Sequence, residues 1–174
     1  MTETPLEPYE IYAVKYAWRD ATRNEHLIFK DPHDDTSMPM DYFVWAIVGK
    51  RKTYVLDTGF DQVEGEKRGR IFLRQPAEGL RMIGVEASNI DDLIISHLHY
   101  DHVGTWDDFP KATLYLQEKE MQFATGRQMR HATLRHSFAV EHIEGVIRAL
   151  YDDRLVYCDP VEELAPGLTL HYAG

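Results

Sequence analysis

The sequence predicts a single α+β domain in which helices cover a mixed β-sheet. Short strand patterns alternate with short helical patterns along the chain, and residues 93–95 (L-I-I) form an entirely apolar run. Such a run is typical of a strand covered on both faces, which requires layers of structure on either side of the sheet. The length of 174 residues suits one core and does not require two.

The first third of the chain reads as strands separated by loops. Residues 10–18 are rich in β-branched and aromatic side chains and predict the first strand. Residues 31–40 hold two prolines and several turn formers, so they predict a loop. Residues 41–48 and 53–56 predict an antiparallel pair. The basic stretch G-K-R-K-T between them favours a solvated turn over a binding site for polyanions.

The remaining elements follow from hydrophobic periodicity and from glycine and proline signals. They are, in chain order, helix 76–84, strand 93–95, strand 112–116, helix 117–124, helix 136–151, strand 155–158 and strand 168–172.

Composition limits the partners of the protein. The formal net charge of −10 argues against nucleic acid, whose binding draws on basic patches. No apolar stretch reaches the roughly 18 residues that predict a membrane span. The N-terminus is acidic and lacks the pattern of a secretory signal, and Cys158 is the one cysteine, so no internal disulfide can form. These features predict a cytoplasmic protein without membrane or nucleic-acid partners.

A dense group of metal-binding residue types follows the apolar strand. Residues 96–104 read S-H-L-H-Y-D-H-V-G. In an extended segment residues two apart point the same way, so His97 and His99 can reach one metal ion. Asp101 and His102 follow where the chain turns and can reach a second ion. Any one histidine here is compatible with a core or surface role, but the whole H-x-H-x-D-H pattern predicts a metal site.

The motif H-L-H-Y-D-H, with Y-V-L-D-T-G-F upstream, resembles the metallo-β-lactamase superfamily. Within it the likeness is greatest to the N-acyl homoserine lactonases, because residues 31–45, 96–104 and 163–174 all resemble that family. The resemblance implies an αββα sandwich with two metal ions at one edge of its sheets. This chain would form the first half of that sandwich, a mixed sheet with covering helices.

Residue roles follow from the resemblance. It implies that His97 and His99 bind the first metal ion and that Asp101 and His102 bind the second, zinc being the ion expected at both positions. Asp101 would also donate a proton to the leaving alkoxide. Asp57 would hold the ligand loop by hydrogen bonds, although an aspartate in a turn before glycine also fits a purely structural role. Because His99 stands where oxygen-reducing di-iron relatives have glutamate, hydrolysis is favoured over redox chemistry.

Four ligands for two ions fall short of the three that a catalytic zinc normally has. The resemblance implies further ligands beyond residue 174, so residues 1–174 are interpreted as a single domain truncated before the third metal-binding histidine. Alternation along the last strand turns His171 away from the apolar side. The other histidines are predicted to face solvent: His26, His33, His131, His136 and His142. Alone, such a chain is expected to expose an apolar sheet face and to hold metal poorly.

The predicted function is the opening of the lactone ring of N-acyl homoserine lactones, or of similar lactones, by a hydroxide that bridges two metal ions. Candidate walls for an acyl groove are Phe60, Phe72, Leu73 and residues 38–40, although these are also typical core positions. The resemblance also suggests a homodimer. Two alternatives stay open: another hydrolase of the same fold, such as a glyoxalase-II-like thioesterase or a phosphodiesterase, or a non-catalytic metal-binding module.

Overall fold

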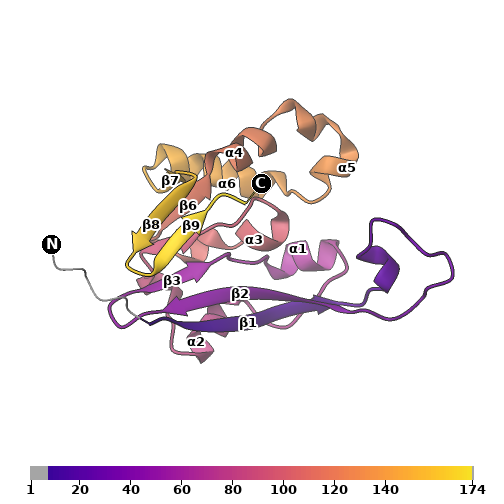
Figure 1. Ribbon diagram of the computed structural model, residues 1–174, viewed down its shortest axis with the longest axis horizontal. Helices are drawn as coiled ribbons and strands as arrows, with labels where there is room; N and C mark the ends of the chain where they lie inside the picture. The colour runs from indigo at the N-terminus through magenta and orange to yellow at the C-terminus, as the bar shows by residue number, and fades with distance from the viewer. Residues whose placement is uncertain (1–7, 174) are drawn as a thin grey trace.

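The computed structural model describes residues 8–173, and its centre is a seven-stranded mixed sheet with the strand order β4-β1-β2-β3-β5-β6-β7 (Figure 1). The strands β1 to β4 pair antiparallel, whereas β3, β5, β6 and β7 run parallel to one another. Their bounds are β1 Glu10–Arg19, β2 Met40–Val48, β3 Thr53–Leu56, β4 Ile71–Phe72, β5 Asp92–Ile94, β6 Thr113–Gln117 and β7 Leu155–Cys158. A separate hairpin consists of β8 Val161–Ala165 and β9 Leu168–His171.

In the described part of the chain six α-helices accompany the sheet. Of these, α2, α4 and α6 follow the pattern predicted for short amphipathic helices. Their bounds are α1 Gln62–Lys67, α2 Pro76–Met82, α3 Tyr100–Val103, α4 Glu118–Ala124, α5 Ala132–Arg135 and α6 Val140–Tyr151. Buried residues of α2, α4 and α6 join the main core, together with every second residue of the central strands. Within residues 8–173, no helix is both long enough and apolar enough to span a bilayer.

The run at residues 93–95 is covered on both faces, as predicted. Leu93 belongs to the main core under the helices, whereas Ile94 belongs to a smaller cluster on the opposite face. In that smaller cluster Ile94 packs with Ile47 and Tyr54, and the β8–β9 hairpin contributes leucines against them. The sheet therefore has a helical layer on one side and a short hairpin on the other.

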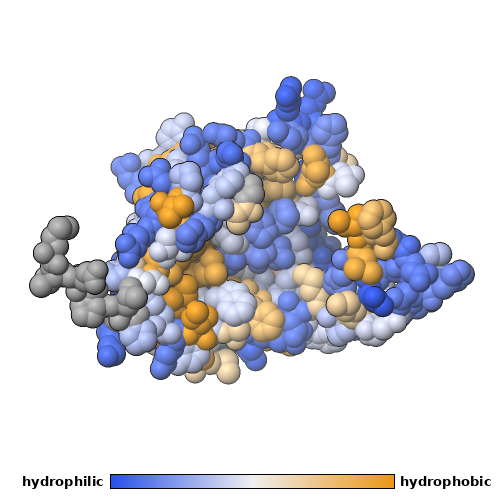
Figure 2. All heavy atoms as spheres, in the orientation of Figure 1, coloured by the Kyte–Doolittle hydropathy of each residue, from blue (hydrophilic) through white to orange (hydrophobic). Residues whose placement is uncertain are grey.

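The β8–β9 hairpin covers only part of the sheet face against which it packs. Apolar side chains on the rest of that face are exposed, as expected. Trp45 pairs with Leu56, and Val156 lies in register with Tyr115 and Ile94. The side chains of Trp45 and Val156 therefore lie on the hairpin side of the sheet. Trp45 is 37% exposed and Val156 is 39% exposed. Figure 2 shows hydrophobic side chains beside the hairpin, and a second apolar group where the segment between β1 and β2 projects from the body.

Several elements differ from the sequence prediction, which contains none of α1, α3 and β4. The helix predicted over residues 136–151 begins only at Val140, and a short helix, α5, precedes it. Residues 136–139 stay non-helical because the carbonyl groups of His136 and Phe138 accept hydrogen bonds from Arg68. Strand β8 is absent from the sequence prediction. Two adjacent glutamates weaken its strand pattern, and its pairing with β9 compensates for them.

Candidate metal centre

The predicted ligands lie at the edge of the sheet where two parallel strands end. Strands β3 and β5 are paired at Leu56 and Ile94, so the residues that follow them emerge side by side. Asp57 follows β3 and donates its backbone N–H to the carbonyl oxygen of Ile94 over 2.8 Å. The histidine-containing loop follows β5, and this shared edge brings Asp57 next to it.

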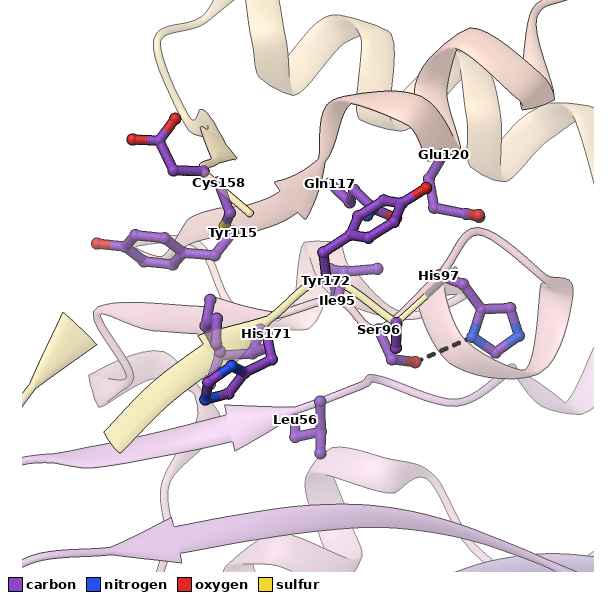
Figure 3. Close-up of a pocket in the computed structure, with 14 residues that line it drawn as sticks. Leu56, Ile95, Ser96, His97, Tyr115, Gln117, Glu120, Cys158, His171 and Tyr172 are labelled. Carbon is purple, nitrogen blue, oxygen red and sulfur yellow. Dashed lines mark hydrogen bonds between the residues drawn. The ribbon is translucent and has the colours of Figure 1, made fainter. Parts of the chain in front are cut away.

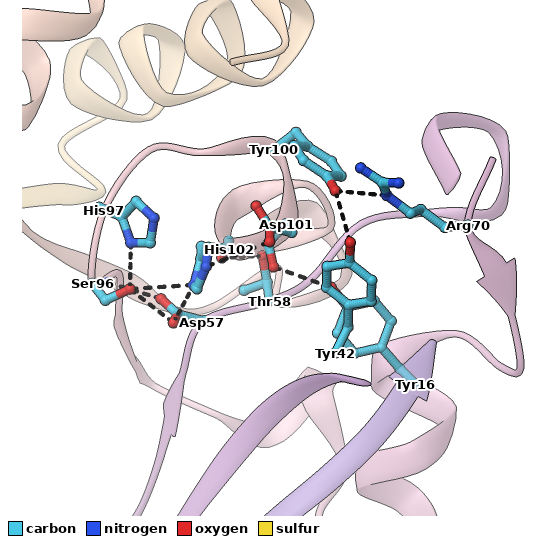
Figure 4. Close-up of polar contacts among 10 residues, drawn as sticks. All are labelled: Tyr16, Tyr42, Asp57, Thr58, Arg70, Ser96, His97, Tyr100, Asp101 and His102. Atoms are coloured by element: carbon cyan, nitrogen blue, oxygen red, sulfur yellow. Dashed lines mark hydrogen bonds and ion pairs between the residues drawn. The ribbon is translucent and has the colours of Figure 1, made fainter. Parts of the chain in front are cut away.

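Asp57 contacts both ends of the histidine-containing loop, at Ser96 and at His102 (Figure 4). One carboxylate oxygen accepts the backbone N–H of Ser96 at 2.8 Å, and the other accepts the Ser96 hydroxyl at 2.8 Å. The second oxygen also lies 2.7 Å from Nδ1 of His102. Asp57 is 4% exposed and has a left-handed backbone with φ of 60°. A histidine whose Nδ1–H is held by a carboxylate keeps Nε2 free for a ligand.

The three imidazoles of the motif are adjacent. The ring centroids of His97 and His102 are 3.9 Å apart, and those of His97 and His99 are 4.5 Å apart. Oδ2 of Asp101 lies 3.7 Å from Nε2 of His102. The buried Leu98 between the first two histidines turns into the core, which leaves both imidazoles on the other side of the loop. The fold thus gathers all four predicted ligands in one place.

Burial and neighbouring charge set the protonation of this group. Burial, together with the neighbouring His102 and His99, lowers the pKa of His97 to about 4. Burial also lowers the pKa of His99. Burial acts on His102 in the same direction, but the hydrogen bond and negative charge of Asp57 outweigh it and raise the His102 pKa. At neutral pH His97 and His99 are uncharged, which is the form of imidazole that binds metals.

The donor set suits zinc by its chemistry, since imidazole nitrogen and carboxylate oxygen are ligands that this ion accepts. The side chains are close to one another without converging on a common point. Among residues 8–173, no three His, Cys, Asp or Glu side chains are grouped so that they could hold one ion. The assignment of ligand pairs to two ions therefore stays a prediction, as does the role of Asp101 as proton donor.

Close backbone contact holds α3 against the turn after β3. Thr58 donates its backbone N–H to the carbonyl oxygen of His102 at 2.7 Å, and Gly104 donates to that of Gly59 at 2.6 Å. The Tyr16 hydroxyl donates to the carbonyl oxygen of Asp101 at 3.1 Å. Sequence reasoning missed Tyr16 and Thr58, although the D-T-G-F motif marks the turn on which these contacts depend.

Gly104 permits this approach, and Gly104→Ala is expected to lower the free energy of unfolding by about 1–3 kcal/mol through overpacking. A Cβ there would lie 2.7 Å from the carbonyl oxygen of Gly59 and 2.9 Å from Cα of Phe60, and backbone atoms cannot easily move away. Urea denaturation measures the change. The backbone of Gly104 has a φ of −75°, which alanine adopts without strain, so the loss measures the clash alone. An unchanged free energy of unfolding contradicts the steric explanation.

A cavity of about 550 Å³ adjoins the ligand group on the hairpin side (Figure 3). Its walls include His97, Gln117 and Glu120 from the sheet side and His171 and Tyr172 from the end of β9. As predicted, Leu170 packs toward the sheet and the neighbouring His171 is exposed. His171 nevertheless borders the same cavity as His97.

Two other sequence predictions are corrected by the structure. His142, predicted to face solvent, is partly buried on α6, and its buried Nδ1 has no hydrogen-bond partner within residues 8–173. It fits there because Gly104 lacks a side chain, and burial lowers its pKa. Phe60, a candidate wall of an acyl groove, is fully buried among tyrosine rings in the core. The other four histidines are exposed or half-exposed, as expected: His26, His33, His131 and His136.

Comparison with known proteins identifies relatives of this arrangement. A family model described as the metallo-beta-lactamase superfamily matches residues 38–147. The N-acyl homoserine lactonase AiiB of Agrobacterium fabrum is 38% identical over 96 residues, which make up 53% of this chain and 34% of that protein. AiiB of Rhizobium rhizogenes gives the same identity and coverage. The chain thus matches about a third of the length of these curated relatives.

Solved structures share the fold at lower identity. A quorum-quenching N-acyl homoserine lactone lactonase has a TM-score of 0.69 at 17% identity and covers 98% of this chain, which spans 65% of that structure. AidC, a dizinc quorum-quenching lactonase in complex with a product, has a TM-score of 0.64 at 17% identity, with coverage of 95% of this chain and 67% of that one. At such identity the likeness establishes the fold, which is the one predicted.

Proposed function

The chain belongs to the metallo-beta-lactamase superfamily of hydrolases, and from this premise we propose that it is a metal-dependent lactonase that opens N-acyl homoserine lactones or similar lactones. The observation that carries the proposal is the group formed by Asp57, His102 and the adjacent imidazoles. A buried carboxylate orients one ligand through Nδ1, and uncharged imidazoles lie beside it. This combination of ligand and supporting acid is typical of metal centres.

In this proposal His97 and His99 hold one divalent ion, Asp101 and His102 hold the other, and zinc is the preferred ion. Bound ions would supply activated water at neutral pH and would stabilise negative charge on the carbonyl oxygen of the substrate. Asp57 keeps His102 oriented. Asp101, whose carboxylate lies 3.7 Å from Nε2 of His102, would take up the proton released by the attacking water and pass it to the departing ring oxygen.

The ligand count sets a further condition. Two donors per ion fall short of the three that catalytic zinc normally has, so we propose that donors outside residues 8–173 complete the site. The cavity beside His97, which His171 also lines, is the place where such donors would enter. The lactone substrate class is supported by the two curated relatives, which are N-acyl homoserine lactonases. A cytoplasmic homodimer belongs to the same proposal, and size-exclusion chromatography tests the dimer.

Chelation is the direct test of metal dependence. Removing metal from the complete protein with a chelator is expected to abolish lactone opening, and added zinc is expected to restore it, because no side chain of the ligand group is by itself a strong nucleophile at neutral pH. Elemental analysis before and after chelation measures the metal content. Lactone opening that persists in a metal-free sample would contradict the proposal.

A substrate panel separates the alternatives. The same preparation is assayed on acyl homoserine lactones, on thioesters and on phosphodiesters. Preference for a thioester or a phosphodiester would identify another hydrolase of this fold, and the net charge of −10 disfavours a nucleic-acid substrate. Less than one metal ion per chain with no activity on any of the three would identify a non-catalytic metal-binding module.

A further inference from the structure

Arg68 joins three segments that are distant in sequence. It caps the C-terminal end of α1, and its side chain is only 11% exposed. Its Nε pairs with the carboxylate of Glu64 in the same helix. Its Nη1 donates to the carbonyl oxygen of His136 at 2.6 Å, and its Nη2 donates to that of Phe138 at 3.2 Å. The plane of the guanidinium also covers the ring of Tyr100, with 3.8 Å between Cζ and the ring centroid.

Both groups that Arg68 touches outside its own helix are in contact with the ligand loop. Tyr100 is the residue directly after His99, and its backbone N–H donates to the carbonyl oxygen of Ser137 at 2.8 Å. The ring of Phe138 meets the imidazole of His99 edge-on, with centroids 4.8 Å apart and an interplanar angle of 89°. His99 therefore lies between Tyr100, whose ring Arg68 contacts, and the ring of Phe138, whose backbone carbonyl oxygen Arg68 binds.

We propose that Arg68 is a positioning residue for His99. Arg68 binds the carbonyl oxygens of His136 and Phe138 and stacks on the ring of Tyr100. Through these contacts it sets the orientation of the His99 imidazole, and this orientation determines whether His99 can bind a metal ion. This inference rests on the proposed function only in treating His99 as a ligand. The position of Arg68, 31 residues before His99 in the chain, carries no motif that assigns such a role.

The contacts require the shape of arginine as well as its charge. A planar guanidinium can bond two carbonyl oxygens and a carboxylate while it stacks on a ring, whereas a lysine ammonium cannot do all of these at once. Glu64 is buried, so a neutral residue at position 68 would leave its charge with only the exposed Lys67 as a partner and would threaten folding. Arg68→Lys is therefore the informative variant, since it keeps the charge and removes the planar fork.

Zinc titration of the complete protein gives the first measurement. Arg68→Lys is expected to weaken zinc binding by about 10–100-fold, the range typical for the loss of a residue that orients a metal ligand. Lys67→Gln is the matched control. Lys67 pairs with the same Glu64 at 3.2 Å, but its side chain is 62% exposed and it donates no hydrogen bond to residues 136–138. The control is expected to bind zinc as the wild type does.

Histidine ring resonances of the metal-free protein give the second measurement. In Arg68→Lys the His99 ring signals are expected to shift, while those of His102, held separately by Asp57, stay in place. Unchanged His99 signals, or equal weakening of zinc binding in both variants, would overturn the inference. If the wild type binds no zinc, the proposed function fails, and the metal-free spectra still decide whether Arg68 positions His99.

Discussion

Replacing Asp57 by asparagine is expected to weaken zinc binding by about 10–100-fold, because Asp57 is the carboxylate that orients His102. Asparagine tolerates the left-handed backbone at this position, where φ is 60°. Its amide has one acceptor oxygen and one donor nitrogen, so it cannot accept from the Ser96 N–H, the Ser96 hydroxyl and His102 together. Losing a hydrogen bond to a buried charge lowers the free energy of unfolding by about 1.5–3 kcal/mol.

Comparing Asp57→Ala with Asp153→Ala separates the loss of the hydrogen bonds from the cost of placing alanine in a left-handed backbone conformation. Asp57→Ala adds the cost of a left-handed alanine, about 1–2 kcal/mol, to the loss of all three contacts. Asp153→Ala is the matched control, because Asp153 has a φ of 57° and is exposed. Zinc titration and urea denaturation of the variants measure both effects. If Asp57→Asn binds zinc as tightly as the wild type, Asp57 is a structural turn residue and has no part in orienting His102.

Replacing Asp101 by asparagine is expected to lower kcat for lactone opening by about 10²–10⁴-fold, the usual contribution of a positioned general acid. Asparagine keeps the shape of the side chain and cannot deliver a proton to the ring oxygen. The predicted role as a metal ligand complicates a simple loss of activity, so metal content is measured on the same samples. Asp152→Asn, an exposed aspartate at the end of α6, serves as the control with unchanged activity.

The leaving group distinguishes the two roles of Asp101. An aryl ester that releases a phenolate needs little help from an acid, so Asp101→Asn is expected to lose much less activity on it than on an alkyl lactone. An equal loss on both substrates, with metal content reduced, would mean that Asp101 acts as a ligand only. An equal loss with full metal content would remove Asp101 from the proton transfer and require another acid.

The local sequence was sufficient for much of the fold. The antiparallel pair β2–β3, the buried β5 and the helix α2 were predicted within a few residues, because each depends on short-range periodicity and on turn residues within the same segment. The types and spacing of His97, His99, Asp101 and His102 also predicted the kind of site. Their adjacency in space follows largely from their adjacency in the chain.

Other features depend on residues that are far apart in the sequence. Residues 136–139 have helical periodicity, yet they stay non-helical because Arg68, at the end of α1, binds their carbonyl groups. His142 is partly buried because Gly104 makes room for it. Asp57 reaches Ser96 and His102 because β3 and β5 end at one edge. The sequence by itself determined which candidate ligands are present. Only the tertiary structure decided how these side chains are held, because hydrogen bonds and steric fit between distant segments leave no periodic trace in the chain.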